Sequence, residues 1–320
     1  MALDERLATG EPEPTGAPLF YRREWLPVRA RNDRGADVTA RVRTADGTAA
    51  PVGPHDHRFL GRLAAEHVLT LELADAPDPG AGGLALVIDG WVEYPYSQTM
   101  VAAAQAGAAY RPPTLEVRDA AGRWEVLLPE FGYPAGMPRR MAVPLPELPA
   151  GATALRLRTN MEIYWDRIAL VRTEPLPEAA RTPARLLGAR LAKVGFPRWT
   201  SGPQRRPHYD YADRSPFWDT RYMEGAYTRL GPVTELVARV DDALVVLGPG
   251  EEVHLELLAP APAPAGWTRR YVLEARGWAK DMDLHTRDGA TVGPLPAAGH
   301  PAGPREALHA RTLTRFLAGP

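Results

Sequence analysis

Proline and glycine interrupt this chain at short intervals. The 320 residues include 34 prolines and 29 glycines, spread along the whole sequence. Proline lacks the N–H that a helix interior needs, and glycine favours turns. The apolar runs between them are short, and many have the two-residue alternation of β-strands. The pattern predicts a mostly β, antiparallel protein with few short helices, at least about 35% strand and under about 20% helix.

Strand signals are densest between residues 60 and 173. A turn sequence, Asp119-Ala-Ala-Gly122, joins two of the runs as a hairpin. A series of short strands separated by turns is typical of an antiparallel β-sandwich. The runs lie at 67–73, 83–88, 114–118, 124–128, 154–159 and 163–171, with further short alternating runs at 20–28 and 37–42 and one or two helical turns expected at 100–107.

The remaining chain divides at changes of composition. We expect a polar arm over 1–17, the β-sandwich domain over 18–173, a connector rich in arginine and aromatic residues over 174–230, a second, smaller β-rich unit over 231–293, and a Pro/Gly-rich tail over 294–320. Within these parts, a short helix is expected at 181–194, irregular loop from there to 229, a helix beginning at Pro232, strands at 243–247, 252–258 and 270–275, and a short helix at 305–317.

Composition excludes several classes of protein. The chain has no cysteine, which rules out disulfides, thiolate metal sites and cysteine nucleophiles. Its formal charge of −1 gives no overall attraction to nucleic acid or to an anionic membrane. No run of 18 apolar residues is present, so we expect no transmembrane segment. If Met1 is the native start, the absence of an apolar leader core predicts a cytoplasmic protein, peripheral at most to the inner membrane.

Two sequence patterns could bind a metal ion. His55-Asp56-His57 would place both imidazoles on one face of an extended strand, but no third ligand is nearby, and we favour a solvated turn. Asp281, Asp283 and Asp288 have alternating oxygen ligands without the remainder of an EF-hand loop, and we favour a role in fixing a turn. We therefore expect no metal and no cofactor.

Catalytic motifs are also missing from the sequence. It contains no GxSxG, HExxH, P-loop or GxGxxG motif. Adjacent acids such as Asp241-Asp242 and Glu251-Glu252 could belong to a hydrolase only if carboxylates faced each other across a cleft. Acids at turns are usually solvated. We expect no enzyme and no catalytic residue.

Aromatic residues near the centre of the sandwich offer a second interpretation. Trp91, Tyr94 and Tyr96 could stack on sugar rings, because aromatic faces match the apolar faces of pyranoses. Tyr164 and Trp165 would extend such a platform. Aromatics within apolar strands more often fill the core, which is the reading we favour for most of them.

The stretch 181–229 combines arginine with aromatic residues. It holds ten basic and four acidic residues, and eight of the 25 Phe, Trp and Tyr residues of the chain. Arginine, tryptophan and tyrosine dominate interface hot spots. Contact with a protein or a membrane surface competes here with the role of an internal connector, while the interleaved acids argue against nucleic acid. The candidate contact residues are Arg198, Trp199, Arg205, Arg206, Tyr209, Tyr211, Arg214, Phe217 and Trp218, with Arg205 and Arg206 expected to be solvated loop charges.

Several stretches together resemble one family. Leu86-Val-Ile-Asp-Gly-Trp-Val-Glu-Tyr94 is followed in order by similar segments at 105–107, 113–117, 132–138, 158–168, 231–252 and 266–283. They resemble the C-terminal module of large bacterial proteins that carry TPR repeats or FG-GAP and ASPIC/UnbV (cartilage-acidic-protein-like) regions. The resemblance implies a galactose-binding-like, jelly-roll sandwich with a second β-rich unit and no catalytic residues. The TPR and FG-GAP parts are missing here, so functions tied to them do not transfer.

A weaker resemblance connects the chain with accessory subunits of bacterial photosynthetic reaction-centre complexes, which implies a cap or clamp. Our leading hypothesis is a non-catalytic structural or accessory subunit that docks on a larger protein assembly, such as a membrane-associated photosynthetic complex. A carbohydrate-binding module is the alternative, and a hydrolase comes third.

Overall fold

Antiparallel strands make up most of the structure. The computed structural model describes residues 2–3, 18–74, 83–175, 181–216, 221–295 and 304–318. It has 41% strand and 10% helix, which confirms the predicted fold class. The chain divides into two compact units. The first comprises Met1–Leu176 and Ser201–His208, and the second Pro177–Thr200 and Tyr209–Pro320.

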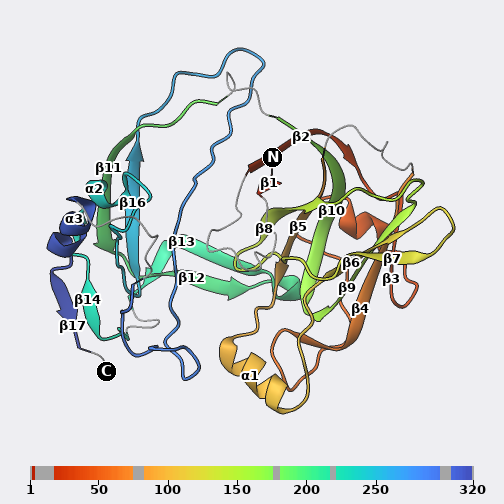
Figure 1. Ribbon diagram of the computed structural model, residues 1–320, viewed down its shortest axis with the longest axis horizontal. Coiled ribbons are helices and arrows are strands. Elements are labelled where there is room, and N and C mark those ends of the chain that lie inside the picture. Colours follow the sequence, from red (N-terminus) through yellow and green to blue (C-terminus); the bar gives the residue numbers. More distant parts are fainter. Residues whose placement is uncertain are drawn as a thin grey trace. The chain divides into compact units, whose positions relative to one another are not determined.

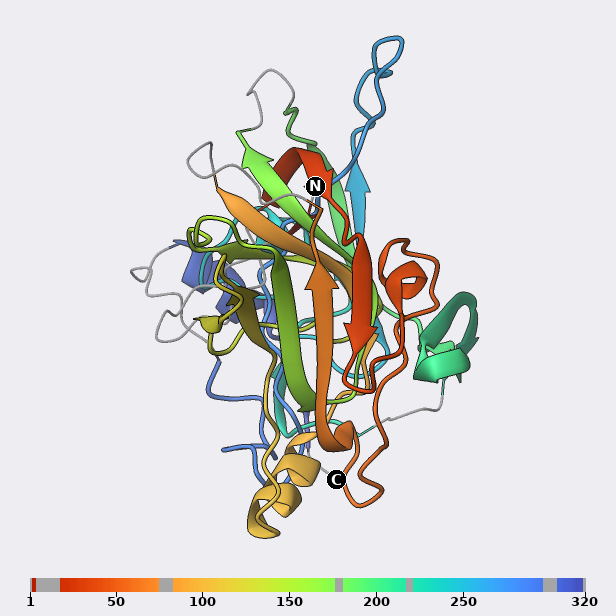
Figure 2. The same ribbon diagram turned by 90° about the vertical axis from the view of Figure 1, so that its right-hand side faces the viewer.

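The first unit is a sandwich of two five-stranded sheets (Figures 1 and 2). One sheet has the order β1 (Ala2–Leu3), β2 (Pro18–Trp25), β10 (Ile163–Glu174), β5 (Leu84–Val92), β8 (Arg139–Leu145). The other has the order β3 (Arg29–Asn32), β4 (Arg62–Glu72), β9 (Ala154–Met161), β6 (Thr114–Arg118), β7 (Trp124–Leu128). The pair β6–β7 is the hairpin predicted from the turn at Asp119–Gly122.

The core of the sandwich follows the alternation of the strands. Leu69 lies opposite Leu157 in one sheet, and Ile88 opposite Ile168 in the other. These side chains are buried in one cluster that also includes Trp165. Because successive side chains point to opposite faces, the residues between them form the outer faces of the sheets. Burial of the inward set stabilises the sandwich through the hydrophobic effect.

Two short helical elements lie in the connections. The helix α1 (Ser97–Gln105) follows β5, as expected near residues 100–107. The strand predicted at 37–42 is wrong, because Thr39–Val42 forms the 3₁₀ turn η1. The carboxylate of Asp37 accepts hydrogen bonds from the backbone N–H of Thr39, at 2.9 Å, and from its hydroxyl, at 2.6 Å. Such local bonds favour a helical start over a strand.

The second unit has a three-stranded sheet in the order β15 (Gly231–Pro232), β11 (Leu186–Lys193), β16 (Glu251–Leu257). Its other elements are α2 (Thr234–Val237), α3 (Pro304–Thr312) and the strand pair β14 (Gly225–Tyr227) and β17 (Arg315–Leu317). Its core contains Ala189, Leu191, Val233, Leu236 and Leu308. None of the helices in the part of the chain that the structure describes is long and apolar enough to cross a membrane.

Several predictions for the second unit are wrong. The helix expected at 181–194 is the strand β11, in which pairing with β16 overrides helix propensity and Gly188 weakens a helix. The expected strands at 243–247 and 270–275 have no regular structure. The helix expected at 305–317 ends at Thr312, before β17. The loop expected after 194 contains a strand pair, β12 (Phe196–Ser201) and β13 (Pro207–Ser215).

Candidate functional site

Three segments of the first unit meet at one end of the sandwich: the loop before β4, the end of β5 and the β9–β10 turn. The N–H of Glu162 donates to the carbonyl of Gly61 at 2.8 Å, and the N–H of Glu93 to the carbonyl of Glu162 at 3.0 Å. Gly61 has φ +70°, and a Cβ there would lie 2.2 Å from the carbonyl oxygen of Glu93. Only glycine permits this approach.

The centre of this site is the buried carboxylate of Glu162. The hydroxyl of Tyr164 donates to its Oε1 at 2.5 Å, and His55 Nε2 and Arg205 Nε lie 3.0 Å and 3.3 Å from the same oxygen. Burial, followed by the hydrogen bond to Glu162, raises the pKa of Tyr164 well above its usual range. Tyr164 therefore stays protonated and continues to donate to the carboxylate.

Glu93 is the second acid of the site. Burial raises its pKa, with a smaller contribution from the charge of Glu162, while Arg205 and His55 act in the opposite direction. Arg205 Nη1 lies 3.8 Å from the carboxylate of Glu93. Arg205 thus stands between two carboxylates and offsets their repulsion.

Arg205 comes from the connection between β12 and β13. The backbones of Gln204 and Arg205 have φ of 53° and 52°, the left-handed region that costs free energy for residues other than glycine. The Gln204 side chain accepts from the N–H of Ala49 at 2.9 Å and donates to its carbonyl at 3.0 Å. The indole of Trp91 donates to the carbonyl of Gln204 at 2.8 Å. These bonds hold residues 201–208, the hairpin tip, in the first unit.

Trp91, Tyr94 and Tyr96, the residues proposed to stack on sugar rings, do not form one exposed platform. Trp91 is only 1% exposed, and its ring stacks on Tyr164 with centroids 5.5 Å apart. The guanidinium of Arg206 also lies over it at 5.8 Å. Trp91 therefore belongs to the buried interior and offers no face to a ligand. Tyr94 and Tyr96 are exposed, and their rings meet edge to face at 6.3 Å.

The residues of the His55-Asp56-His57 triplet do not share one binding partner. The carboxylate of Asp56 accepts two bonds from the Arg58 side chain, at 3.0 Å and 2.9 Å, and pairs with Arg62. The hydrogen bond from Arg58 holds the pKa of Asp56 far below its usual range. The two imidazole centroids are 6.4 Å apart. Among the residues that the structure describes, no three histidines or acids are grouped so that they could hold a metal ion.

Most of the predicted contact residues lie on the hairpin β12–β13. Arg198 pairs with Asp213 at 3.0 Å, and Arg214 pairs with Glu252 of β16 at 2.5 Å. Tyr209 lies near Tyr211, with ring centroids 6.5 Å apart. Trp199 is half-exposed. Phe217 and Trp218 lie outside the described residues.

Arg205 and Arg206 are exposed loop residues, as expected, but each also contacts a buried side chain of the sandwich. Arg205 pairs with the buried Glu162, and Arg206 covers the ring of Trp91. The sequence gives no sign of these contacts, because the partners are far away in the chain. Glu93 and Glu162 were missed for the same reason.

Asp283 has a structural role in the second unit. Its carboxylate accepts hydrogen bonds from the backbone N–H groups of His285, at 2.7 Å, and Thr286, at 2.8 Å. The carboxylate thereby holds the turn that ends near Asp288, which has φ +57°. This arrangement supports the turn-fixing interpretation of the aspartates.

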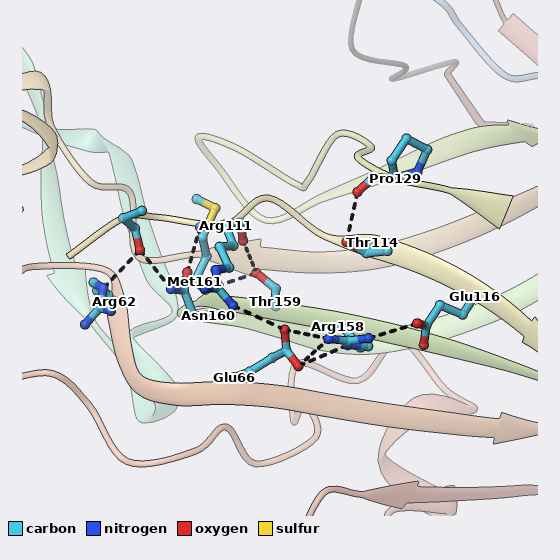
Figure 3. Close-up of polar contacts among 11 residues, drawn as sticks. Arg62, Glu66, Arg111, Thr114, Glu116, Pro129, Arg158, Thr159, Asn160 and Met161 are labelled. Atoms are coloured by element: carbon cyan, nitrogen blue, oxygen red, sulfur yellow. Dashed lines mark hydrogen bonds and ion pairs between the residues drawn. The ribbon is translucent and has the colours of Figure 1, made fainter. Parts of the chain in front are cut away.

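The outer face of the second sheet carries a row of ion pairs (Figure 3). The Arg158 side chain donates to both oxygens of Glu66, at 3.0 Å and 3.1 Å, and to Glu116 at 2.9 Å. Beside it, the Asn160 side chain accepts from the N–H of Arg111 at 2.7 Å and donates to the carbonyl of Ala109 at 2.9 Å. Each polar group in this row is fixed by its neighbours.

A segment without regular secondary structure follows β16 in the second unit. It comprises residues 259–282, contains no strand and no helix, and is called the 259–282 segment below. Figure 2 shows its first part rising as a loop beyond the end of β16. Its large apolar side chains are strongly exposed: Trp267 68%, Tyr271 70%, Leu273 68% and Trp278 56%.

No family model, no curated protein and no solved structure matches the chain. The resemblance to the ASPIC/UnbV-associated module therefore stays a prediction.

Proposed function

We propose that this chain is a non-catalytic accessory protein that docks on a larger protein assembly through the 259–282 segment. The observation that supports this function is the exposure of two tryptophans, a tyrosine and a leucine along a stretch without regular structure. Exposed apolar groups in a contiguous set are typical of interaction sites. Tryptophan and tyrosine are also the residue types that contribute most at hot spots.

The backbone of the segment suits recognition by another protein. An extended peptide can add to the edge of a partner's sheet, with its alternate side chains filling pockets. Tyr271 and Leu273 have the spacing that places both side chains on one face of such a strand. Residues 270–275, whose alternating sequence predicted a strand, would then form that strand by pairing with the edge of the partner's sheet.

The charge of the segment defines the partner's surface further. The segment contains four basic residues, Arg269, Arg270, Arg276 and Lys280, and two acidic ones, Glu274 and Asp281. A partner with apolar pockets and an acidic rim would complement it, because opposite potentials steer association. A membrane-associated photosynthetic complex is the assembly that the weaker resemblance favours.

Replacement of the exposed aromatics tests this function. We expect the full chain with Trp267→Ala and Tyr271→Ala to lose its partner in co-purification from the native organism, with affinity at least about 30-fold lower, as for hot spots. Its melting temperature should stay close to that of the wild type, because both side chains are already in water. Reaction-centre polypeptides among the lost proteins would support the photosynthetic assignment.

The matched control is Phe316→Ala, which removes a similarly exposed aromatic from β17 of the same unit. It should leave the partner bound. If the double variant retains every partner of the wild type at unchanged affinity, the docking role of the segment is wrong.

A further inference from the structure

Two pockets in the first unit share Arg62 as a lining residue. The first, of about 270 Å³, is lined by His55, His57, Arg58, Arg205 and neighbouring residues, and Arg62 closes one side. The second, of about 290 Å³, has Arg62, Glu66, Arg111 and Asn160 in its wall. Figure 3 shows Arg62 and Asn160 bonded to the same backbone carbonyl, that of Ala109, and Arg111 beside Glu66. We call the two pockets together the Arg62 groove.

The most exposed charges of the Arg62 groove are two arginines. The side chains of Arg58 and Arg111 are 65% and 70% exposed, whereas that of Arg62 is 15% exposed. The acids are less exposed: 7% for Asp56, 2% for Glu162 and 30% for Glu66. A ligand that approaches from solvent therefore meets guanidinium groups first, and the groove favours an anion.

The exposed arginines retain donors for such a ligand. Arg58 uses Nε and Nη2 for Asp56, and a guanidinium has five N–H donors in all. Within the described ranges, Arg111 is paired with a carboxylate at 3.9 Å, from Nη1 to Glu66, which is too long for a hydrogen bond. Planar forks of this kind bind carboxylate or sulfate groups in bidentate fashion.

Other groups in the groove suit hydroxyls, which both donate and accept. Glu66 and Asn160 supply acceptor oxygens, and His57 can act in either role. Next to the first pocket, a Cβ on Gly61 would lie 3.2 Å from Pro95, whose exposed chain neighbours Tyr94 and Tyr96 lie outside the lining of both pockets. Their rings can pack on the C–H face of a sugar.

We infer that the Arg62 groove binds an acidic oligosaccharide, one whose sugar rings carry carboxylate or sulfate groups. An acidic peptide would use the arginines equally well. Protein interfaces, however, are centred on buried apolar anchors, and the groove offers mostly charged and polar walls. The site lies in the first unit and does not depend on the docking segment of the second.

Binding of the full chain to a purified alginate oligosaccharide tests this site. Isothermal titration calorimetry at low ionic strength should give saturable binding to this uronate chain and none to a neutral cellulose oligosaccharide of the same length. Binding should weaken as salt rises, because the arginines are exposed. Arg111→Gln should raise Kd about tenfold, the value of one charge-assisted hydrogen bond, with the melting temperature unchanged.

Two further variants make the result specific. Arg22→Gln, which changes an arginine on β2 that is slightly more exposed than Arg111, should leave Kd unchanged. Tyr96→Ala should raise Kd several-fold for alginate and leave any binding of poly-glutamate unaffected. The inference is overturned if alginate does not bind at about 1 mM, or if Arg111→Gln binds as tightly as the wild type. It is equally overturned if Arg22→Gln loses as much affinity, or if poly-glutamate binds as well as alginate without any effect of Tyr96→Ala.

Discussion

At the scale of single residues, a buried ion pair of the second unit joins β17 to the start of β16. The carboxylate of Glu251 is fully buried and accepts two bonds from the Arg315 guanidinium, at 2.7 Å and 2.9 Å. Tyr222 and the N–H of Gly248 donate to it as well, each at 3.0 Å. Burial alone would raise the pKa of Glu251, but these bonds, led by that of Arg315, hold it below 4.5.

Removal of the cation should therefore destabilise the protein in a pH-dependent way. At pH 7, Arg315→Leu leaves a buried charge without its partner and should cost about 3 kcal/mol of unfolding free energy. In the wild type, the lowered pKa contributes stability above pH 4.5 that is lost on acidification. In the variant, burial raises the pKa of Glu251, so protonation removes the penalty. The difference between the two proteins should narrow from pH 7 to pH 4.

Urea denaturation over this pH range measures that difference. Arg287→Leu is the control, since the side chain of Arg287 is almost fully exposed and pairs with its neighbour Asp288. It should change stability little at any pH. A constant difference between the wild type and Arg315→Leu from pH 7 to pH 4 would contradict the assigned role of Glu251.

At the scale of elements, the hairpin tip is attached to the sandwich by the bonds of Gln204 and the ion pair of Arg205. Arg205→Gln should weaken its attachment by about 1–3 kcal/mol, because the buried Glu162 loses a cationic neighbour. Hydrogen–deuterium exchange should then accelerate at the N–H groups of Gly202 and Arg206, which bond across the tip. The same change at Arg198, on β12, removes only an exposed pair with Asp213 and should leave exchange in the tip unchanged. Equal exchange in both variants would show that Arg205 does not hold the tip.

How much could be predicted from the sequence differs between elements. The strands of the sandwich were predictable, because alternation such as that of Leu69 and Leu71 reports directly on a half-buried sheet. The strand β11 was not predictable, since its residues also suit a helix. It is a strand because it pairs with β16. The candidate site could not be predicted from the sequence, for a related reason. Glu93, Glu162 and Arg205 are ordinary surface residues in the sequence, and only the fold brings them together.

At the scale of the whole molecule, the sandwich strands of the first unit depend on residues that follow the last of them, β10, in the chain. A chain ending at Leu176 contains every strand of the sandwich but lacks Gln204, the partner of Ala49 and Trp91. We expect this shortened chain to fold with a lower melting temperature than the first unit has in the full-length protein. The indole N–H of Trp91 should also exchange faster with solvent, as measured by NMR. A synthetic peptide covering 198–212 should restore both properties when added. If the shortened chain melts like the intact one and ignores the peptide, the tip contributes nothing to the sandwich.

The same dependence affects how the protein emerges from the ribosome. Ala49 and Gln204 are 155 positions apart, and the last sandwich strand, β10, ends at Glu174. At about 5–20 residues per second, translation needs a few seconds to proceed from there to residue 204. During that interval a nascent sandwich can form while its Trp91 edge is still open. During those seconds a chaperone or a competing chain can bind beside Trp91, before Gln204 of the same chain arrives to cover it.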